Sequence, residues 1–223
     1  LVAVLRELGR ADDALTLLRR PPQTPEQHEL LDSPEFQQEV VAVAVEAGRA
    51  AEAEAAYAAM LKQEPEQTEW RVGLARLRLI DGRRNEAAQL FMEAIDRTDE
   101  TQPLMALAAG ARRVALYEAA LAAARKAGRK DKAAHVRAVL FEADVLRQQG
   151  RTDEALSLLR TLMASVETDM PLLLPLAETF ERYGDRAEAL RLFRRLYENT
   201  RTEDMLLKVA WLLEEEQRFD EAF

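Results

Sequence analysis

A short phrase that recurs about every 34 residues constrains this chain more than any other feature of its 223-residue sequence. In its five clearest copies the phrase is a glycine, four residues of which the last is Asp or Glu, and then an alanine. Two degenerate copies, at residues 115–120 and 217–222, complete the series. The closing alanines are Ala14, Ala53, Ala87, Ala120, Ala155, Ala189 and Ala222, separated by 39, 34, 33, 35, 34 and 33 residues. Such a period indicates a repeat array rather than ordinary globular domains.

The phrase has a physical explanation as the turn between two antiparallel helices. Glycine adopts the left-handed conformation that closes a helix, and the acidic residue then complements the positive end of the next helix dipole. The closing alanine permits the close approach of two helices, and the residues twelve positions earlier are small as well. The predicted helix pairs are 34 to 47 with 50 to 62, 67 to 81 with 84 to 97, 102 to 113 with 117 to 127, 131 to 149 with 152 to 165, and 169 to 183 with 186 to 198.

Three departures from the pattern carry expectations of their own. Five extra residues follow the first copy, where Pro21, Pro22 and Pro25 break the second helix. The fourth repeat lacks the turn glycine and carries Gly110 inside its first helix, so we expect local irregularity around residues 98 to 130. Arg78 occupies a position that is otherwise apolar, and we expect its stem to pack while its guanidinium reaches solvent.

Seven copies in register resemble the tetratricopeptide repeat family over essentially the whole chain. The resemblance implies an all-α fold, a right-handed superhelix (α-solenoid) of antiparallel helix pairs, with a concave groove lined by the first helix of each pair. We expect about six to seven repeats with truncated ends, in a fragment of a longer array. The predicted single solenoid spans residues 1–223, with repeats at approximately 1–33 (partial), 34–67, 68–101, 102–130, 131–168, 169–201 and 202–223 (partial).

The sequence contains few residues whose type and spacing suit catalysis or metal binding. The chain has no cysteine, and His28 and His135 are its only histidines, too far apart in a solenoid to share a metal or a catalytic triad. The run Glu214-Glu215-Glu216 fans out around a helix, as a solvated surface does. The net charge of −9 argues against nucleic-acid or anionic-membrane binding, and no apolar run is long enough to insert in a membrane. We therefore predict no catalysis, no cofactor and no metal.

The resemblance also selects groove-facing positions, at fixed distances before each closing alanine. Arginines gather in the middle of the predicted groove and acidic residues towards its C-terminal part. The arginines suit an acidic peptide or a carboxylate, or they pair with acids on neighbouring helices. Trp211 is a partner anchor, or it packs against the second helix of its own repeat. The candidate groove residues are Arg76, Met105, Arg112, Arg137, Arg147, Glu178, Glu181, Asp204, Trp211 and Glu214.

The predicted function is a non-catalytic scaffold for protein–protein interaction. In its composition and degenerate repeats the chain also resembles the periplasmic tetratricopeptide scaffolds of Gram-negative exopolysaccharide export proteins of the Pel biofilm type. That resemblance implies a periplasmic region that recruits a polysaccharide-modifying enzyme, such as a deacetylase or hydrolase, and helps guide a charged polymer to an outer-membrane pore. Two alternatives stay open: a regulatory or substrate-recognition arm of a larger cytoplasmic enzyme or signalling protein, and direct carbohydrate binding by the groove.

Overall fold

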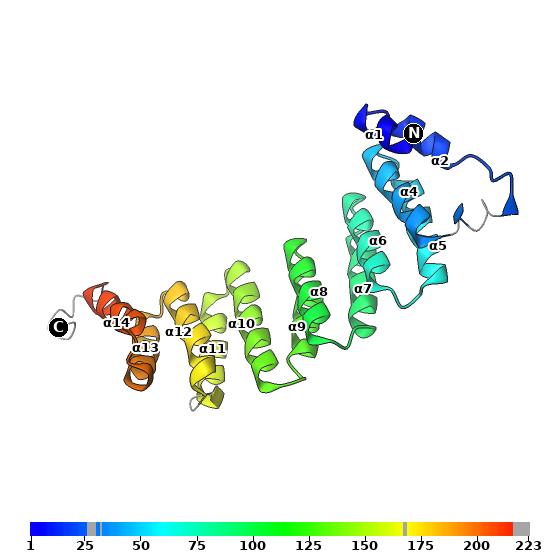
Figure 1. The fold of residues 1–223 in the computed structure, drawn as a ribbon. Helices are drawn as coiled ribbons and strands as arrows, with labels where there is room; N and C mark the ends of the chain where they lie inside the picture. The colour runs from blue at the N-terminus through cyan, green and yellow to red at the C-terminus, as the bar shows by residue number, and fades with distance from the viewer. Residues whose placement is uncertain (26–29, 32, 167–168, 216–223) are drawn as a thin grey trace. The chain divides into compact units, whose positions relative to one another are not determined.

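The structure, a computed structural model, describes residues 1–25, 30–31, 33–166 and 169–215 (Figure 1). These residues form thirteen helices and no strand. The chain divides into two compact units, residues 1–99 and residues 100–223. The first contains α1 (Val2–Glu7), α2 (Ala11–Leu18), α4 (Pro34–Glu46), α5 (Ala50–Gln63), α6 (Thr68–Ile80) and α7 (Arg84–Asp96). The second contains α8 (Thr101–Arg113), α9 (Tyr117–Ala127), α10 (Lys132–Gln148), α11 (Thr152–Val166), α12 (Met170–Tyr183), α13 (Arg186–Thr200) and α14 (Glu203–Glu215).

The predicted helix pairs are present, and their ends differ from the predicted ones by at most two residues. In the first unit α4 packs against α5 and α6 against α7; in the second, α8 packs against α9, α10 against α11 and α12 against α13 (Figure 1). We call the first helix of each pair the leading helix. α14, packed on α13, is the leading helix of the next repeat. The seventh copy of the phrase, at 217–222, and His28 lie outside the described residues.

Glycine follows five helices, α1, α4, α6, α10 and α12, as predicted, with φ angles between 69° and 83°. At Gly150 the hydrogen bonds are those of a Schellman motif: its N–H donates to the carbonyl of Arg147, and the next N–H donates to that of Leu146. The turn between α8 and α9 repeats these bonds with Ala115 in place of glycine, at a φ of 58°. The irregularity expected in the fourth repeat is therefore absent from its turn, because an alanine adopts the left-handed conformation there.

The small and large positions of the repeat build the core. All six closing alanines within the described residues are fully buried, and so are large side chains four residues later, such as Phe91, Leu159 and Phe193. Buried apolar residues between 14 and 77 form one cluster in the first unit, and those between 136 and 213 form another in the second. Each leading helix thus buries one face against its partner, and its other face is left for solvent or a ligand.

Arg78 is half-buried and pairs with two acids. Its side chain is 21% exposed, and Nη1 lies 3.1 Å from a carboxylate oxygen of Glu54 and 3.4 Å from one of Glu86. The two acids come from the helices on either side, α5 and α7, so the arginine bridges the packing surface. Trp70 packs against the core of the first unit, and its Nε1 donates to Glu64 at 3.1 Å.

Candidate functional site

The predicted groove residues lie on the uncovered side of the leading helices. They are Arg76 on α6, Met105 and Arg112 on α8, Arg137 and Arg147 on α10, Glu178 and Glu181 on α12, and Asp204, Trp211 and Glu214 on α14. All ten are exposed or half-buried. Arg76 belongs to the first unit and the other nine to the second. That they bind a partner stays a prediction, as does the grouping of Arg76 with the arginines of the second unit.

Four of the ten meet in one shallow depression between α12 and α14, of about 600 Å³. Its walls are Leu174, Glu178 and Glu181 from α12, and Asp204, Met205, Leu207, Lys208 and Trp211 from α14. Leu207 is 59% exposed and Trp211 is 45% exposed. The neighbouring Val209, Leu212 and Leu213 are buried. We call this hollow the acidic depression.

The charges of the acidic depression are only partly paired. The ammonium of Lys208 lies 3.0 Å from both carboxylate oxygens of Glu181, and 5.9 Å from the centre of the Trp211 ring. Among the described residues neither Glu178 nor Asp204 has an ion-pair partner, and both are exposed. One ammonium thus faces three carboxylates, so the depression attracts positive charge.

Two of the predicted arginines instead belong to a network centred on Asp144. Asp144 lies on α10 and accepts a hydrogen bond of 2.6 Å from the hydroxyl of Tyr183 on α12. Its carboxylate oxygens lie 3.8 Å from the guanidinium of Arg112 on α8 and 3.4 Å from that of Arg182 on α12. Arg147 lies over the Tyr183 ring at 5.2 Å. Burial, followed by the bond to Asp144, raises the pKa of Tyr183 well above its ordinary value.

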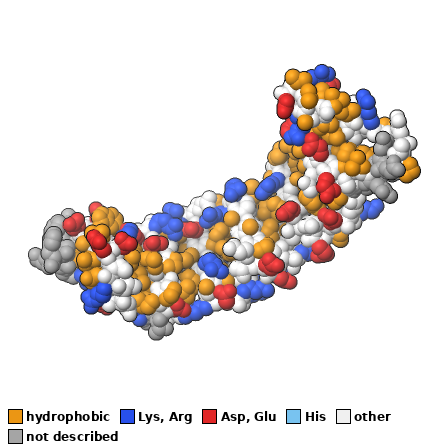
Figure 2. All heavy atoms as spheres, in the orientation of Figure 1, with side chains coloured by type: hydrophobic (Ala, Val, Ile, Leu, Met, Phe, Trp, Pro, Cys, Tyr) orange, Lys and Arg blue, Asp and Glu red, His pale blue; other side chains and the backbone are white. Residues whose placement is uncertain are grey.

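This network ties together three successive leading helices. Of the two interpretations of the arginines, the pairing with neighbouring acids therefore describes Arg112, whereas Arg137 has no ion pair among the described residues. The same kind of pairing occurs in the first unit, where Arg6 on α1 contacts Glu39 at 3.0 Å and Glu46 at 2.5 Å on α4. On the visible surface, too, acidic and basic side chains are interspersed (Figure 2).

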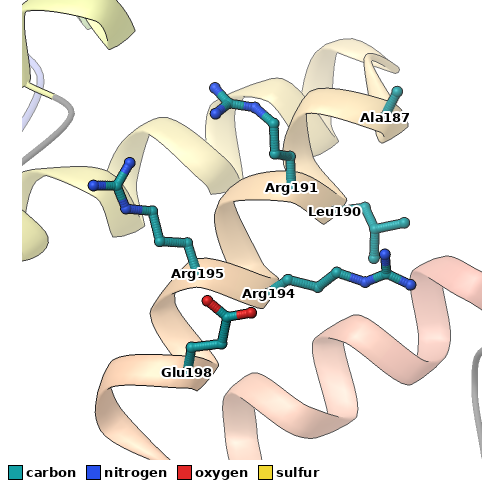
Figure 3. A pocket seen from close by; sticks show the side chains of 6 residues that line it. All are labelled: Ala187, Leu190, Arg191, Arg194, Arg195 and Glu198. Atoms are coloured by element: carbon teal, nitrogen blue, oxygen red, sulfur yellow. The ribbon is translucent and has the colours of Figure 1, made fainter.

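A second depression, of about 530 Å³, lies on α13 and was not predicted from the sequence. It is lined by Ala187, Leu190, Arg191, Arg194, Arg195 and Glu198. Figure 3 shows that the three guanidinium groups project from the helix in different directions, so they do not converge on one ligand. The spacing of the arginines at 191, 194 and 195 could have indicated this depression, because it places them on neighbouring turns of one helix.

Little else in the structure suggests chemistry. In residues 1–25, 30–31, 33–166 and 169–215, no cluster of His, Asp and Glu is arranged to hold a metal ion. No helix in the same part of the chain is long and apolar enough to cross a membrane. His135, on α10, is exposed. The acidic depression is therefore the strongest candidate for a functional site among the described residues.

Comparison with known proteins supports the repeat assignment. The tetratricopeptide repeat family model matches residues 44–111, and the helix pairs of the described residues have the contacts typical of that repeat. No curated protein matches the chain.

Similar solved structures include a tetratricopeptide repeat protein from Parabacteroides merdae ATCC 43184, at 17% identity and a TM-score of 0.46, covering 99% of this chain and 86% of that one. Another is the C-terminal part of a tetratricopeptide repeat-containing protein from Cytophaga hutchinsonii, at 12% identity and a TM-score of 0.46, covering 99% and 90%. A third is YrrB, a tetratricopeptide protein with an unusual peptide-binding site, at 14% identity and a TM-score of 0.39, covering 85% and 95%. At these scores no binding site is carried over to this chain.

Proposed function

We propose that this chain is a non-catalytic scaffold that binds a partner protein on the uncovered face of its leading helices. The observation that carries the proposal is the acidic depression, where Leu207 and Trp211 are exposed beside unpaired carboxylates. Tetratricopeptide repeats mediate protein–protein interaction, and the match of that family's model to residues 44–111 supports the proposal.

The energetic reason lies in how unusual such an exposed aromatic is in this molecule. On α14, Val209, Leu212 and Leu213 are buried against its neighbours, whereas Leu206 is 44% exposed and Leu207 is 59% exposed. An exposed tryptophan beside a leucine leaves apolar area that water solvates poorly, and such residues dominate binding energy when a partner covers them. An exposed apolar surface rimmed by charge is typical of a site for another macromolecule.

Site-specific photo-crosslinking in cells that make the protein tests the proposal. One variant carries the crosslinking residue at Leu207 on α14, and a matched control carries it at Thr161, an exposed position on α11. We expect a discrete crosslinked protein from Leu207 and none from Thr161. Equal products from both positions, or none from either, would contradict a scaffold that binds through its leading helices.

The narrower proposal is a periplasmic scaffold of bacterial exopolysaccharide export, which recruits a polysaccharide deacetylase or hydrolase and helps guide the polymer. Its support is the resemblance in repeat style, together with the acidic character of the chain and the unpaired Glu178 and Asp204. A partly deacetylated polymer carries positive charge and suits such a surface through weak, multivalent contacts. Isothermal titration with partly deacetylated and fully acetylated oligosaccharides tests it: we expect heat only from the charged ligand, and no heat from either at millimolar concentration would contradict polymer binding.

A further inference from the structure

We infer that the acidic depression binds a short cationic, amphipathic segment of a partner protein, with an apolar side chain on Leu207 and Trp211 and a Lys or Arg between Glu178 and Asp204. The inference rests on the proposed scaffold function and adds the chemistry of the partner.

The two stripes have the spacing of one helical face each. On α12 the stripe is Leu174, Glu178 and Glu181, and on α14 it is Asp204, Leu207 or Lys208, and Trp211. Both follow the spacing of three or four residues that brings side chains onto one side of a helix. At about 100° per residue, Trp211 lies nearly opposite the buried Val209 and Leu213 on α14, and the buried Leu212 lies between these two sides. The tryptophan is thus not part of the face that packs on α13.

The charge pattern selects a cation. Lys208 is held between both oxygens of Glu181 at 3.0 Å, and its ammonium also lies 5.7 Å from the centre of the Phe193 ring. Lys208 is the only basic side chain among the described residues that line the depression, and this position keeps it at the α12 side. Glu178 and Asp204 have no ion pair within the described part of the chain, so they are available for a positive group of a partner.

An acidic segment or an anionic lipid surface would meet like charge there, which disfavours it by electrostatic repulsion. A purely apolar partner would leave both carboxylates desolvated without a partner, at a cost in free energy. A segment with an apolar side chain and a positive charge complements both the apolar and the acidic parts of the depression. The preferred occupant is therefore a helix or extended strand with one apolar side chain close to a Lys or Arg.

Tryptophan fluorescence of the full chain provides the test, because Trp70 and Trp211 are the only tryptophans. In a Trp70→Phe background, Trp211 is the single reporter. The probe is a synthetic peptide of about 15 residues made of Leu, Lys and Ala, with its leucines on one helical face. Its counterpart carries Glu in place of every Lys. We expect a saturable blue shift of Trp211 emission with the Lys peptide, weakened by salt, and none with the Glu peptide.

Variants locate the binding. With a fluorescently labelled Lys peptide, Glu178→Gln with Asp204→Asn should weaken binding about 10-fold, and Trp211→Ala about 30-fold. The matched control, Glu118→Gln with Asp153→Asn, makes the same chemical changes on α9 and α11 and should bind as the wild type does. Far-UV circular dichroism confirms that each variant is folded.

Several outcomes would overturn the inference: equal binding of the Glu peptide, unchanged binding by the Glu178 and Asp204 variant, or loss of Lys-peptide binding in the control. A dimer that Trp211→Ala converts to a monomer would identify a second copy as the occupant. A blue shift with glucosamine oligomers but not with the Lys peptide would identify a carbohydrate. If crosslinking at Leu207 succeeds while the Lys peptide fails, only the cationic segment is wrong; if both fail, the scaffold proposal is wrong as well.

Discussion

Two turns in residues 100–223 have the same backbone geometry, but the residue in the left-handed conformation differs between them. Between α10 and α11 the left-handed residue is Gly150, with a φ of 78°; between α8 and α9 it is Ala115, with a φ of 58°. In both turns the N–H of this residue and the next N–H donate to carbonyls of the last helical turn, with all four N–O distances at 2.9 Å. The motif therefore does not depend on glycine alone.

The residue after the turn shows what compensates for the alanine. At Gly150 it is Arg151, which is exposed, whereas at Ala115 it is Leu116, which is only 6% exposed. The helical residue that Leu116 bonds back to, Ala111, is fully buried. A Schellman turn is commonly accompanied by an apolar contact between these two positions. We infer that burial of Leu116 offsets the strain of a left-handed alanine.

The largest expected effect removes that compensation. Leu116→Arg places a charged side chain where an apolar one is buried, and we expect a loss of about 2–3 kcal/mol in the free energy of unfolding. Urea unfolding followed by circular dichroism measures it. The matched change at the other turn, Arg151→Leu, should alter stability far less, because Arg151 is exposed. Equal effects of the two substitutions would show that Leu116 has no special role.

The next effect exchanges the turn residue itself. Gly150→Ala should destabilise the chain by about 1–2 kcal/mol, the cost of a left-handed conformation for an L-residue. A Cβ at Gly150 would meet no atom of the surrounding residues within 4 Å, so the loss comes from the local backbone conformation and not from a clash with a packed neighbour. Thermal unfolding measures the shift, and an unchanged midpoint would mean that the left-handed conformation carries no cost at this turn.

A smaller effect of opposite sign is expected at the other turn. Ala115→Gly should stabilise the chain by about 0.5–1 kcal/mol, because relief of strain exceeds the added freedom of the unfolded chain. The control Ala109→Gly, in the middle of α8, should destabilise it by about the same amount. If both substitutions destabilise the protein, the α8–α9 turn carries no strain for glycine to relieve.

These turns also show how far the sequence determines the fold. The 34-residue period predicts the five helix pairs from α4 to α13 because it repeats the same local chemistry: a left-handed closure, an acidic first turn and a small residue at the crossing. Ala115 breaks the local pattern, but its turn keeps the shape that packing of α8 on α9 imposes. The missing glycine predicts an irregular turn, but the tertiary contacts between α8 and α9 outweigh this local preference.

The sequence predicts which residues of the candidate site lie on the uncovered face of the helices, but not which ion pairs these residues form. Offsets from the closing alanines select residues on the uncovered face of each leading helix, since that face follows from helical periodicity. Lys208 and Arg182 lie one residue away from the selected offsets, and both form ion pairs, Lys208 with the predicted groove residue Glu181 and Arg182 with Asp144. Which acid each base reaches depends on the placement of neighbouring helices and on rotamers, which the repeat period does not encode. Gly73 is similar: a Cβ there would overlap the Tyr57 ring, a close approach that only packing reveals.

The smallest expected effect concerns Asp144. Its carboxylate links α8 and α10, the two helices that end at the compared turns. Arg112 near the end of α8 lies 3.8 Å from its carboxylate, and Tyr183 donates a hydrogen bond to it. Since the folded state raises the pKa of Tyr183, it favours the neutral phenol. The resulting stabilisation is complete below the ordinary tyrosine pKa, about 10, and is lost as the pH rises through the folded value.

Absorbance of tyrosinate at about 295 nm against pH measures this coupling. We expect Tyr183→Phe to leave the rise near pH 10 unchanged and to remove part of the later rise, because Tyr183 ionises late in the folded protein. Asp144→Asn should move that part of the rise back towards pH 10, because it removes the carboxylate charge that opposes a second negative charge beside it. If Tyr183→Phe instead removes absorbance at pH 10, Tyr183 ionises as in an unfolded chain, and Asp144 does not link α10 to α12 in solution.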